Sequence, residues 1–386
     1  MIKIRDLVEL EGIFDLPLHT GKVPPWLATV MRRLSRAIID VMVIEWGPDK
    51  VVERLTNPLW FQAFNNAIGM DWDSSGSTTV TLGILKEVVD PLEHGFMILG
   101  GKGEKAREVP NEALRAQELL GVDSNALIRL SKLVAKGDTV VIQDGHTLYH
   151  HSFLISESGK WAVIQQGMNL STKLARRYHW QGTLGSNGSE LVSGFKQDFA
   201  IDASQNEGLK KLIVDLVNEQ PSKVISEYKK AKAMLSGNVP IEFYARGYEV
   251  KLSKNLRLIY GKPIDEKKVY EVLKGLYEVK PRNLEEVLLN GIGPSTARAL
   301  YLISDLIYNE PPSYDDPVKV PYDPLKYALA HGGKDGAPIP VNRKIAYEII
   351  HTLEEIIERA KLERHNKEAA LRKLRELHSG RAEEGA

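Results

Sequence analysis

Cysteine is absent from the 386 residues of the sequence, which excludes disulfide bonds and metal sites built from thiolates. No run of about 18 apolar residues occurs, so the sequence predicts no transmembrane helix. The first residues also lack the pattern of a secretory signal peptide. We therefore expect a cytoplasmic protein that is not attached to a membrane.

The chain also has no net charge at pH 7, because 51 basic residues balance 51 acidic residues. This balance argues against a protein that coats nucleic acid through bulk positive charge, so any contact with nucleic acid must be a local patch. Hydrophobic residues make up 43% of the chain and charged residues 26%, which is typical of a globular protein. The missing cysteine and the Glu/Lys/Arg-rich C-terminal segment also fit a thermophile.

The order of the sequence patterns predicts a mixed, α+β chain with several parts. Residues 1–205 are the expected N-terminal α/β domain, residues 206–262 a connecting helix and linker, and residues 263–386 an all-helical domain that ends in a charged helix. Within the first part, β-branched runs separated by turn dipeptides predict a small antiparallel meander. Its expected strands lie at residues 139–143, 149–156 and 161–166.

Asn-Gly-Ile-Gly-Pro-Ser-Thr-Ala, within Leu288–Leu300, has the spacing of a helix-hairpin-helix. Ile292 is expected to point into the core, while the flanking glycines allow positive φ and the close approach of a phosphate. Backbone N–H groups at the N-terminus of the next helix bind phosphate in such a turn. A plain turn between two helices uses the same residues and is the alternative. The predicted contacts with nucleic acid, most readily DNA, are Gly291, Gly293, Ser295 and Thr296.

A second candidate surface for nucleic acid lies between Glu157 and Glu190, where no acidic residue occurs. Basic and aromatic side chains alternate in this segment, a combination that suits phosphate contact and base stacking. A solvated face with its aromatic residues in the core is the alternative. A glycine-rich loop that includes Lys334 is predicted to be a further contact beside the hairpin. The predicted phosphate contacts of the basic segment are Lys160, Arg176 and Arg177.

Polar residues are unusually dense on the expected meander. Asp144 and His146 flank a turn glycine, and His150 and His151 on the next strand must face opposite sides. An Asp-x-His turn with one strand histidine and Gln166 suits a divalent cation or a water that attacks phosphorus. We therefore predict that Asp144 and His146 bind Mg²⁺ or Mn²⁺, and that they act in catalysis with His150 and Gln166. Histidines that only bond to their neighbours are the alternative.

A further catalytic set is predicted from paired carboxylates near a Lys–Glu pair, which suit metal-dependent cleavage of phosphodiesters. Helix capping explains the acidic loop in this set equally well. Its members are Asp71, Asp73, Lys86 and Glu87.

Two carboxylates after the hairpin, Asp315 and Asp316, lie where DNA glycosylases with a helix-hairpin-helix place a catalytic aspartate. Bifunctional glycosylases place a lysine immediately before the Thr-Ala pair, and this chain has Ser295 there. A serine forms no Schiff base, so this pattern predicts at most a monofunctional glycosylase.

The chain resembles a largely archaeal, thermophile-associated family of unknown function whose hairpin is similar to that of DNA repair proteins. The resemblance supplies no activity. Together with the motifs it favours a DNA-processing enzyme, first a metal-dependent nuclease of DNA repair, with a glycosylase or a non-catalytic DNA-binding protein as alternatives and the oligomeric state open. The strings that carry the resemblance are Pro17–Lys22, Gln143–Gly145, Tyr149–Phe153, Gln165–Asn169, Ala175–Trp180 and His331–Gly336.

Overall fold

The protein has a mixed α+β structure in a computed structural model, as the sequence predicts, and it divides into two compact units. The first unit comprises Met1–Ser131, His146–Lys196 and Val318–Ala386, and the second comprises Lys132–Gly145 and Gln197–Pro317. The described residues are 15–17, 23, 25–70, 75–185, 189–193, 200–238, 260–316, 351–352, 354–359 and 368.

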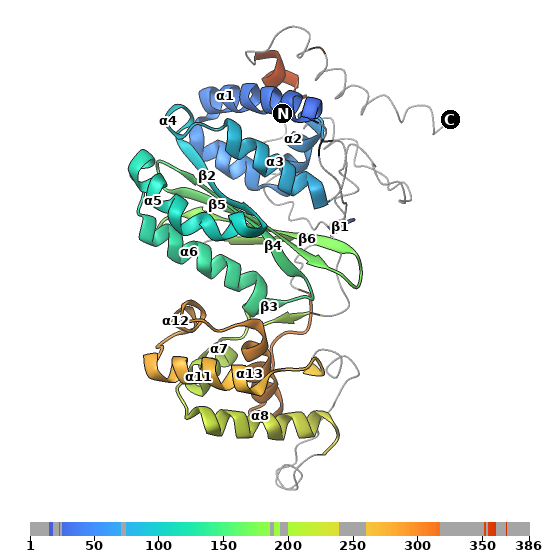
Figure 1. The fold of residues 1–386 in the computed structure, drawn as a ribbon, viewed down its shortest axis with the longest axis vertical. Helices are drawn as coiled ribbons and strands as arrows, with labels where there is room; N and C mark the ends of the chain where they lie inside the picture. Colours follow the sequence, from blue (N-terminus) through green and yellow to red (C-terminus); the bar gives the residue numbers. More distant parts are fainter. Residues whose placement is uncertain are drawn as a thin grey trace, which may run out of the picture. The chain divides into compact units, whose positions relative to one another are not determined.

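A six-stranded antiparallel sheet forms the centre of the first unit (Figure 1). Its order is β1-β6-β5-β4-β2, and β7 also pairs with β6. The predicted meander is confirmed in two of its strands, β4 and β5, which pair in register. The strands are β1 (Asp15–Pro17), β2 (Phe96–Lys102), β4 (Thr147–Ser156), β5 (Lys160–Asn169), β6 (Leu174–Thr183) and β7 (Ser189–Ser193).

The segment predicted as the first strand of the meander, residues 139–143, lies in the second unit. Most of it belongs to a π-helical turn, Gly137–Val141. Only β3 (Ile142–Gln143) is extended, and it pairs with β8 (Ile201–Asp202) in a separate two-stranded sheet. β-branched residues thus continue a helix here, because the wide turn buries Val140 against the second core.

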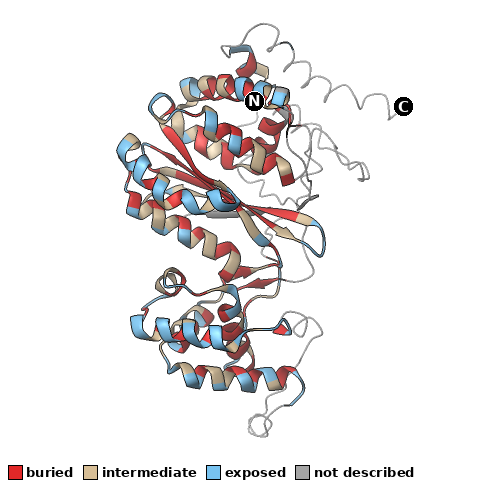
Figure 2. Ribbon diagram, in the orientation of Figure 1, coloured by how far each residue is buried: buried red, intermediate tan, exposed pale blue. Residues whose placement is uncertain are grey.

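Helices cover both faces of the large sheet, with α1, α2 and α3 on one face and α5 and α6 on the other (Figure 1). The strands between them are buried along most of their length (Figure 2). No helix among the described residues is both long and apolar enough to cross a membrane. The helices are α1 (Pro25–Thr56), α2 (Pro58–Ala67), α3 (Ser75–Val88), α4 (Pro91–His94), the 3₁₀ turn η2 (Gly103–Glu108), α5 (Val109–Leu120) and α6 (Ser124–Lys136).

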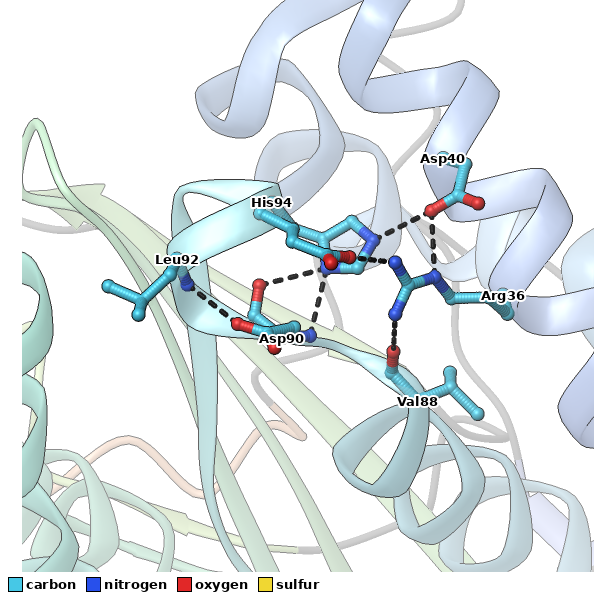
Figure 3. A network of polar contacts seen from close by, with 7 residues as sticks. Arg36, Asp40, Val88, Asp90, Leu92 and His94 are labelled. Atoms are coloured by element: carbon cyan, nitrogen blue, oxygen red, sulfur yellow. Dashed lines mark hydrogen bonds and ion pairs between the residues drawn. The ribbon is translucent and has the colours of Figure 1, made fainter.

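A polar network fixes the entry to β2 by joining α4 to α1 (Figure 3). Asp40 on α1 accepts a hydrogen bond from Arg36 Nε at 2.9 Å and lies 2.9 Å from His94 Nε2. Arg36 also pairs with Glu93 on α4. Asp90 caps the N-terminus of α4 by accepting from the N–H of Leu92 at 2.9 Å. These bonds hold a one-turn helix that has little apolar surface of its own.

The second unit is helical around its own apolar core. Leu209, Leu273 and Leu300 come from three different helices and are fully or almost fully buried in that core. Residues predicted as a connecting segment therefore contain two of its helices. The helices are α7 (Glu207–Val217), α8 (Pro221–Leu235), α11 (Glu266–Val279), α12 (Leu284–Leu289) and α13 (Pro294–Leu306).

Candidate functional site

A row of polar side chains crosses the large sheet on the face covered by α3. Lys102 on β2 pairs with His150 on β4, His150 with Gln166 on β5, and Gln166 with Arg177 on β6. Directly paired residues share one face of a sheet, so these side chains are neighbours. His150, Gln166 and Arg177 are buried, while Lys102 is exposed at the edge strand. His150 and Gln166, which the sequence nominates together, therefore lie on the same face of the sheet.

Gln166 joins this row to the N-terminus of α3. Its Nε2 donates to the carbonyl of Ser75 at 2.8 Å, and its Oε1 accepts from the hydroxyl of Thr78. The same Nε2 also donates to the hydroxyl of Tyr149, at the β-bulge in β4. An amide that meets this many partners is held in one orientation, as a binding or catalytic group must be.

Arg177 is fully buried beneath α2 and α3. Its Nη2 donates to Ser77 Oγ at 2.6 Å, and both terminal nitrogens lie 3.3 Å from Gln62 Oε1. Its guanidinium lies 5.3 Å from the centre of the Phe61 ring. A side chain enclosed in this way ties helices to the sheet and does not reach a nucleic acid.

The predicted phosphate contacts of β6 therefore need correction, because Arg176 and Arg177 are both 0% exposed. Two aromatic residues of the same segment, Trp161 and Tyr178, are also core residues. Trp161 stacks on Phe153 with ring centres 6.1 Å apart, and Tyr178 is fully buried. The physical reason is that β6 is an inner strand whose residues Ala175–His179 are all buried, so even its charged residues point into the protein. Lys160, at the start of β5, is partly exposed.

His150 is neutral in this environment. Burial is the main reason that its pKa is lowered to about 3, and nearby cations such as Lys102 and Arg177 lower it further. Its Nε2 lies 2.9 Å from Ser152 Oγ, whereas Nδ1 has no hydrogen-bond partner among the described residues. A neutral imidazole with a spare nitrogen can bind a metal ion or orient a water, but it is a weak general base.

His151 confirms the predicted alternation of faces. It points to the other side of the sheet, where it bonds to Gln165 at 2.7 Å and to Ser131 on α6 at 2.8 Å. His146 also lies on that side, since a Cβ built on Gly167 would meet the Cβ of His146 at 2.8 Å. Gly167 follows Gln166 on β5 and so faces away from it. His146 and His150 are therefore on opposite faces, which corrects their predicted cluster.

Asp144 and His146 are both buried. Asp144 belongs to the second unit and His146 to the first. Among the described residues, no group of three or more His, Cys, Asp or Glu side chains is arranged to hold a metal ion. Asp71, Asp73 and Lys334, which the sequence also nominates, lie outside the described residues.

Lys86 and Glu87 both lie on α3 but have different partners. The ammonium of Lys86 bonds to Glu112 at 2.6 Å and to the carbonyl of Gly100 at 2.7 Å, which joins α3 to α5 and β2. Glu87 forms an exposed ion pair with Arg32 at 2.6 Å. The pair predicted from the sequence therefore does not converge on one site in the structure.

Two helices joined by a short turn, α12 and α13, lie in the second unit where the sequence predicts the hairpin. Ile292 is 1% exposed and packs in the core, as expected. Gly291 has φ +98°, which only glycine adopts readily, but Gly293 has φ −113° and ψ 169°, which is ordinary extended backbone. Pro294 occupies the first position of α13, where its missing N–H costs nothing.

The outer side of this turn is open. A Cβ built on Gly291 or on Gly293 would meet nothing within 4 Å. Gly293, the N-cap residue of α13, has no side chain that could cap the helix, whereas Asn283 caps α12 and Asp265 caps α11. The first N–H groups of a helix have no partner within the helix, and such groups can bind an anion. Ser295 is exposed and Thr296 is buried.

The carboxylates after the hairpin differ from each other, since Asp315 is exposed and Asp316 is buried. A group that the sequence did not suggest lies beside them. The hydroxyl of Tyr314 donates to Asp305 Oδ2 at 2.5 Å and lies 2.9 Å from the hydroxyl of Tyr260. Burial raises the pKa of Asp305. Tyr260 is distant from Tyr314 in the sequence, so no local pattern predicts this contact.

The fold and these sites define an α+β protein. A row of mostly buried polar side chains crosses the sheet of its first unit, and a turn with two glycines joins α12 to α13 in its second unit. The chain belongs to the family described as "Protein of unknown function (DUF763)", whose model matches residues 12–341. No curated protein and no solved structure matches the chain. The match covers most of the sequence, as the resemblance predicts.

Proposed function

We propose that this protein binds DNA through the α12–α13 hairpin, used as a helix-hairpin-helix that contacts the phosphate backbone without reading sequence. The observation that supports this most directly is the open, uncapped N-terminus of α13 next to Gly291 and Gly293. Backbone N–H groups and the positive end of the helix dipole both favour a phosphate there. Anchoring of Ile292 in the core holds the turn in place for that contact.

A Gly293→Val substitution tests this proposal. The backbone at position 293 suits any residue, and a Cβ added there meets no described atom within 4 Å, so we expect the fold to be retained. Its methyl groups would occupy the space that a phosphate needs. Affinity for duplex DNA, measured by fluorescence anisotropy, should fall about tenfold or more, a loss of about 1.4 kcal/mol or more.

Gly275→Val on α11 is the matched control, because a Cβ at position 275 also meets nothing within 4 Å. It should leave DNA affinity unchanged. A folded Gly293→Val protein that binds DNA as tightly as the wild type would remove the hairpin from the interface.

We further propose that the protein processes the DNA it binds, as a metal-dependent nuclease acting in repair. The support is the density of histidine and amide groups on β4 and β5, where His150 pairs with Gln166 and His151 with Gln165. The transition state of phosphodiester cleavage gains negative charge, which Mg²⁺ or Mn²⁺ would offset. Cleavage of duplex DNA should need the metal, stop in chelator and be lost in Asp144→Asn.

Two further variants locate the reaction, because His146 and His150 lie on opposite faces of the sheet. Loss of cleavage in only one of His146→Gln and His150→Gln identifies the face that carries the chemistry. A glycosylase would instead act in chelator, release a free base from damaged DNA and lose activity in Asp315→Asn or Asp316→Asn. If wild-type protein alters neither plain nor damaged duplexes, the proposal reduces to DNA binding.

A further inference from the structure

The hairpin turn has no positive charge of its own. None of residues 290–296 is basic, and Glu285 and Glu286 lie in the preceding helix α12. Arg282 is already paired with Glu286 at 2.9 Å, and Arg298 on α13 is partly buried. Affinity for DNA depends mainly on cations that neutralise phosphates. A cationic side chain from outside the turn would therefore strengthen phosphate binding there.

Lys136, the last residue of α6, is such a side chain. Its Nζ donates a hydrogen bond to the carbonyl of Ile292, at the centre of the turn. Burial lowers the pKa of this partly buried ammonium, since it has lost part of its water. An ammonium carries three N–H donors, and the carbonyl uses only one of them.

The chain that follows Lys136 is bonded to the same hairpin, which fixes the position of the ammonium. Gln143 Nε2 donates to the carbonyl of Pro294 at 3.1 Å. The hydroxyl of Tyr301 on α13 donates to the carbonyl of Val140 at 3.0 Å. Residues 136–143 thus bond to the turn and to α13 at three points, and we call them the bracing segment. All of these residues belong to the second unit.

We propose that Lys136 is the phosphate-binding cation of the hairpin, contributed by the bracing segment and not by α12 or α13. This inference rests on the proposed binding of DNA by the hairpin. Its ammonium would contact one oxygen of the phosphate that the N–H groups of α13 hold, and its bond to Ile292 would keep it there. Sequence motifs do not reveal this residue, because it precedes the hairpin by more than a hundred positions.

The test is the salt dependence of DNA binding by the full-length chain. Lys136→Met keeps an apolar stem of similar size but loses the charge, so the slope of log affinity against log salt should become shallower by roughly 0.9. Lys136→Arg keeps the charge and should retain most of the slope. Lys274→Met, at an exposed position on α11, removes an equal charge elsewhere and should leave the slope nearly unchanged.

The possible results separate this inference from the proposed function. If wild-type protein does not bind duplex DNA at low salt, both are overturned. If it binds and Lys136→Met lowers affinity equally at every salt concentration, Lys136 only braces the turn and the inference is wrong. An equal change of slope in Lys274→Met would also overturn it, because bulk charge would then explain the effect. Thermal unfolding of each variant checks that the fold is retained.

Discussion

Two histidines of the first unit, His150 and His179, are buried in their uncharged form. Burial is the main cause that lowers the pKa of each to about 3. In the unfolded chain a histidine has a pKa near 6.5, so between pH 6.5 and 3 the unfolded state binds more protons. Stability is therefore complete above pH 6.5 and falls as the pH decreases. At pH 5 each histidine should cost about 2 kcal/mol.

Urea unfolding at pH 7.5 and pH 5 measures this loss. His179→Leu keeps a buried apolar side chain and removes one titrating group, so the difference in stability between the two pH values should shrink by about 2 kcal/mol. An undiminished acid sensitivity in His179→Leu would show that other groups cause it.

The direction in which a side chain points was predictable where local periodicity alone determines it. The inward position of Ile292 follows from its place between two turn glycines, and the opposite directions of His150 and His151 follow from strand alternation. Arg176 and Arg177 were not predictable in this way. The burial of Arg177 depends on α2 and α3, which pack over one face of β6, and nothing local to β6 predicts what covers it.

At the scale of elements, the sequence predicts strands well where two turn signals bound an alternating run, as in β4 and β5. It fails at residues 137–141, where β-branched residues form a π-helical turn. Tertiary contacts decide this case, because Tyr301 bonds to the carbonyl of Val140 and the side chain of Val140 is buried. Local propensity is weaker than such packing.

The same comparison explains why the candidate site was only partly predictable. The pairing of His150 with Gln166 follows from the hairpin between β4 and β5, which is local. The contacts of Gln166 and Arg177 with α3 join residues about ninety to a hundred positions apart. Only the folded arrangement brings these groups together. The sequence therefore shows that the strands are rich in polar residues, but it does not show which residues these side chains contact.

At the scale of the whole molecule, the second unit is discontinuous in sequence, whereas the predicted boundaries at residues 205 and 262 assume continuous parts. Val140 and Ile201 are 1% exposed in its core and come from before residue 206. Burial of these two side chains contributes about 3 to 6 kcal/mol, which is comparable to the whole stability of a small domain.

A fragment of residues 206–386 should therefore fail to fold cooperatively. It lacks Val140 and Ile201 and also the three hydrogen bonds that the bracing segment makes with the hairpin. Circular dichroism during thermal unfolding would show a broad transition or none. DNA binding by this fragment should be much weaker than that of the full chain, because the hairpin is no longer held in place.

A second construction tests whether the missing segment is the cause. Gln143 and Ile201 are paired in the two-stranded sheet, so the chain ends near these residues lie close together. Joining residues 132–145 to residues 197–386 through a short Gly/Ser linker restores every described part of the second unit. This protein should unfold cooperatively and bind DNA with the salt dependence of the full chain. Cooperative unfolding of the 206–386 fragment alone would instead mean that the earlier segment contributes little to the second core.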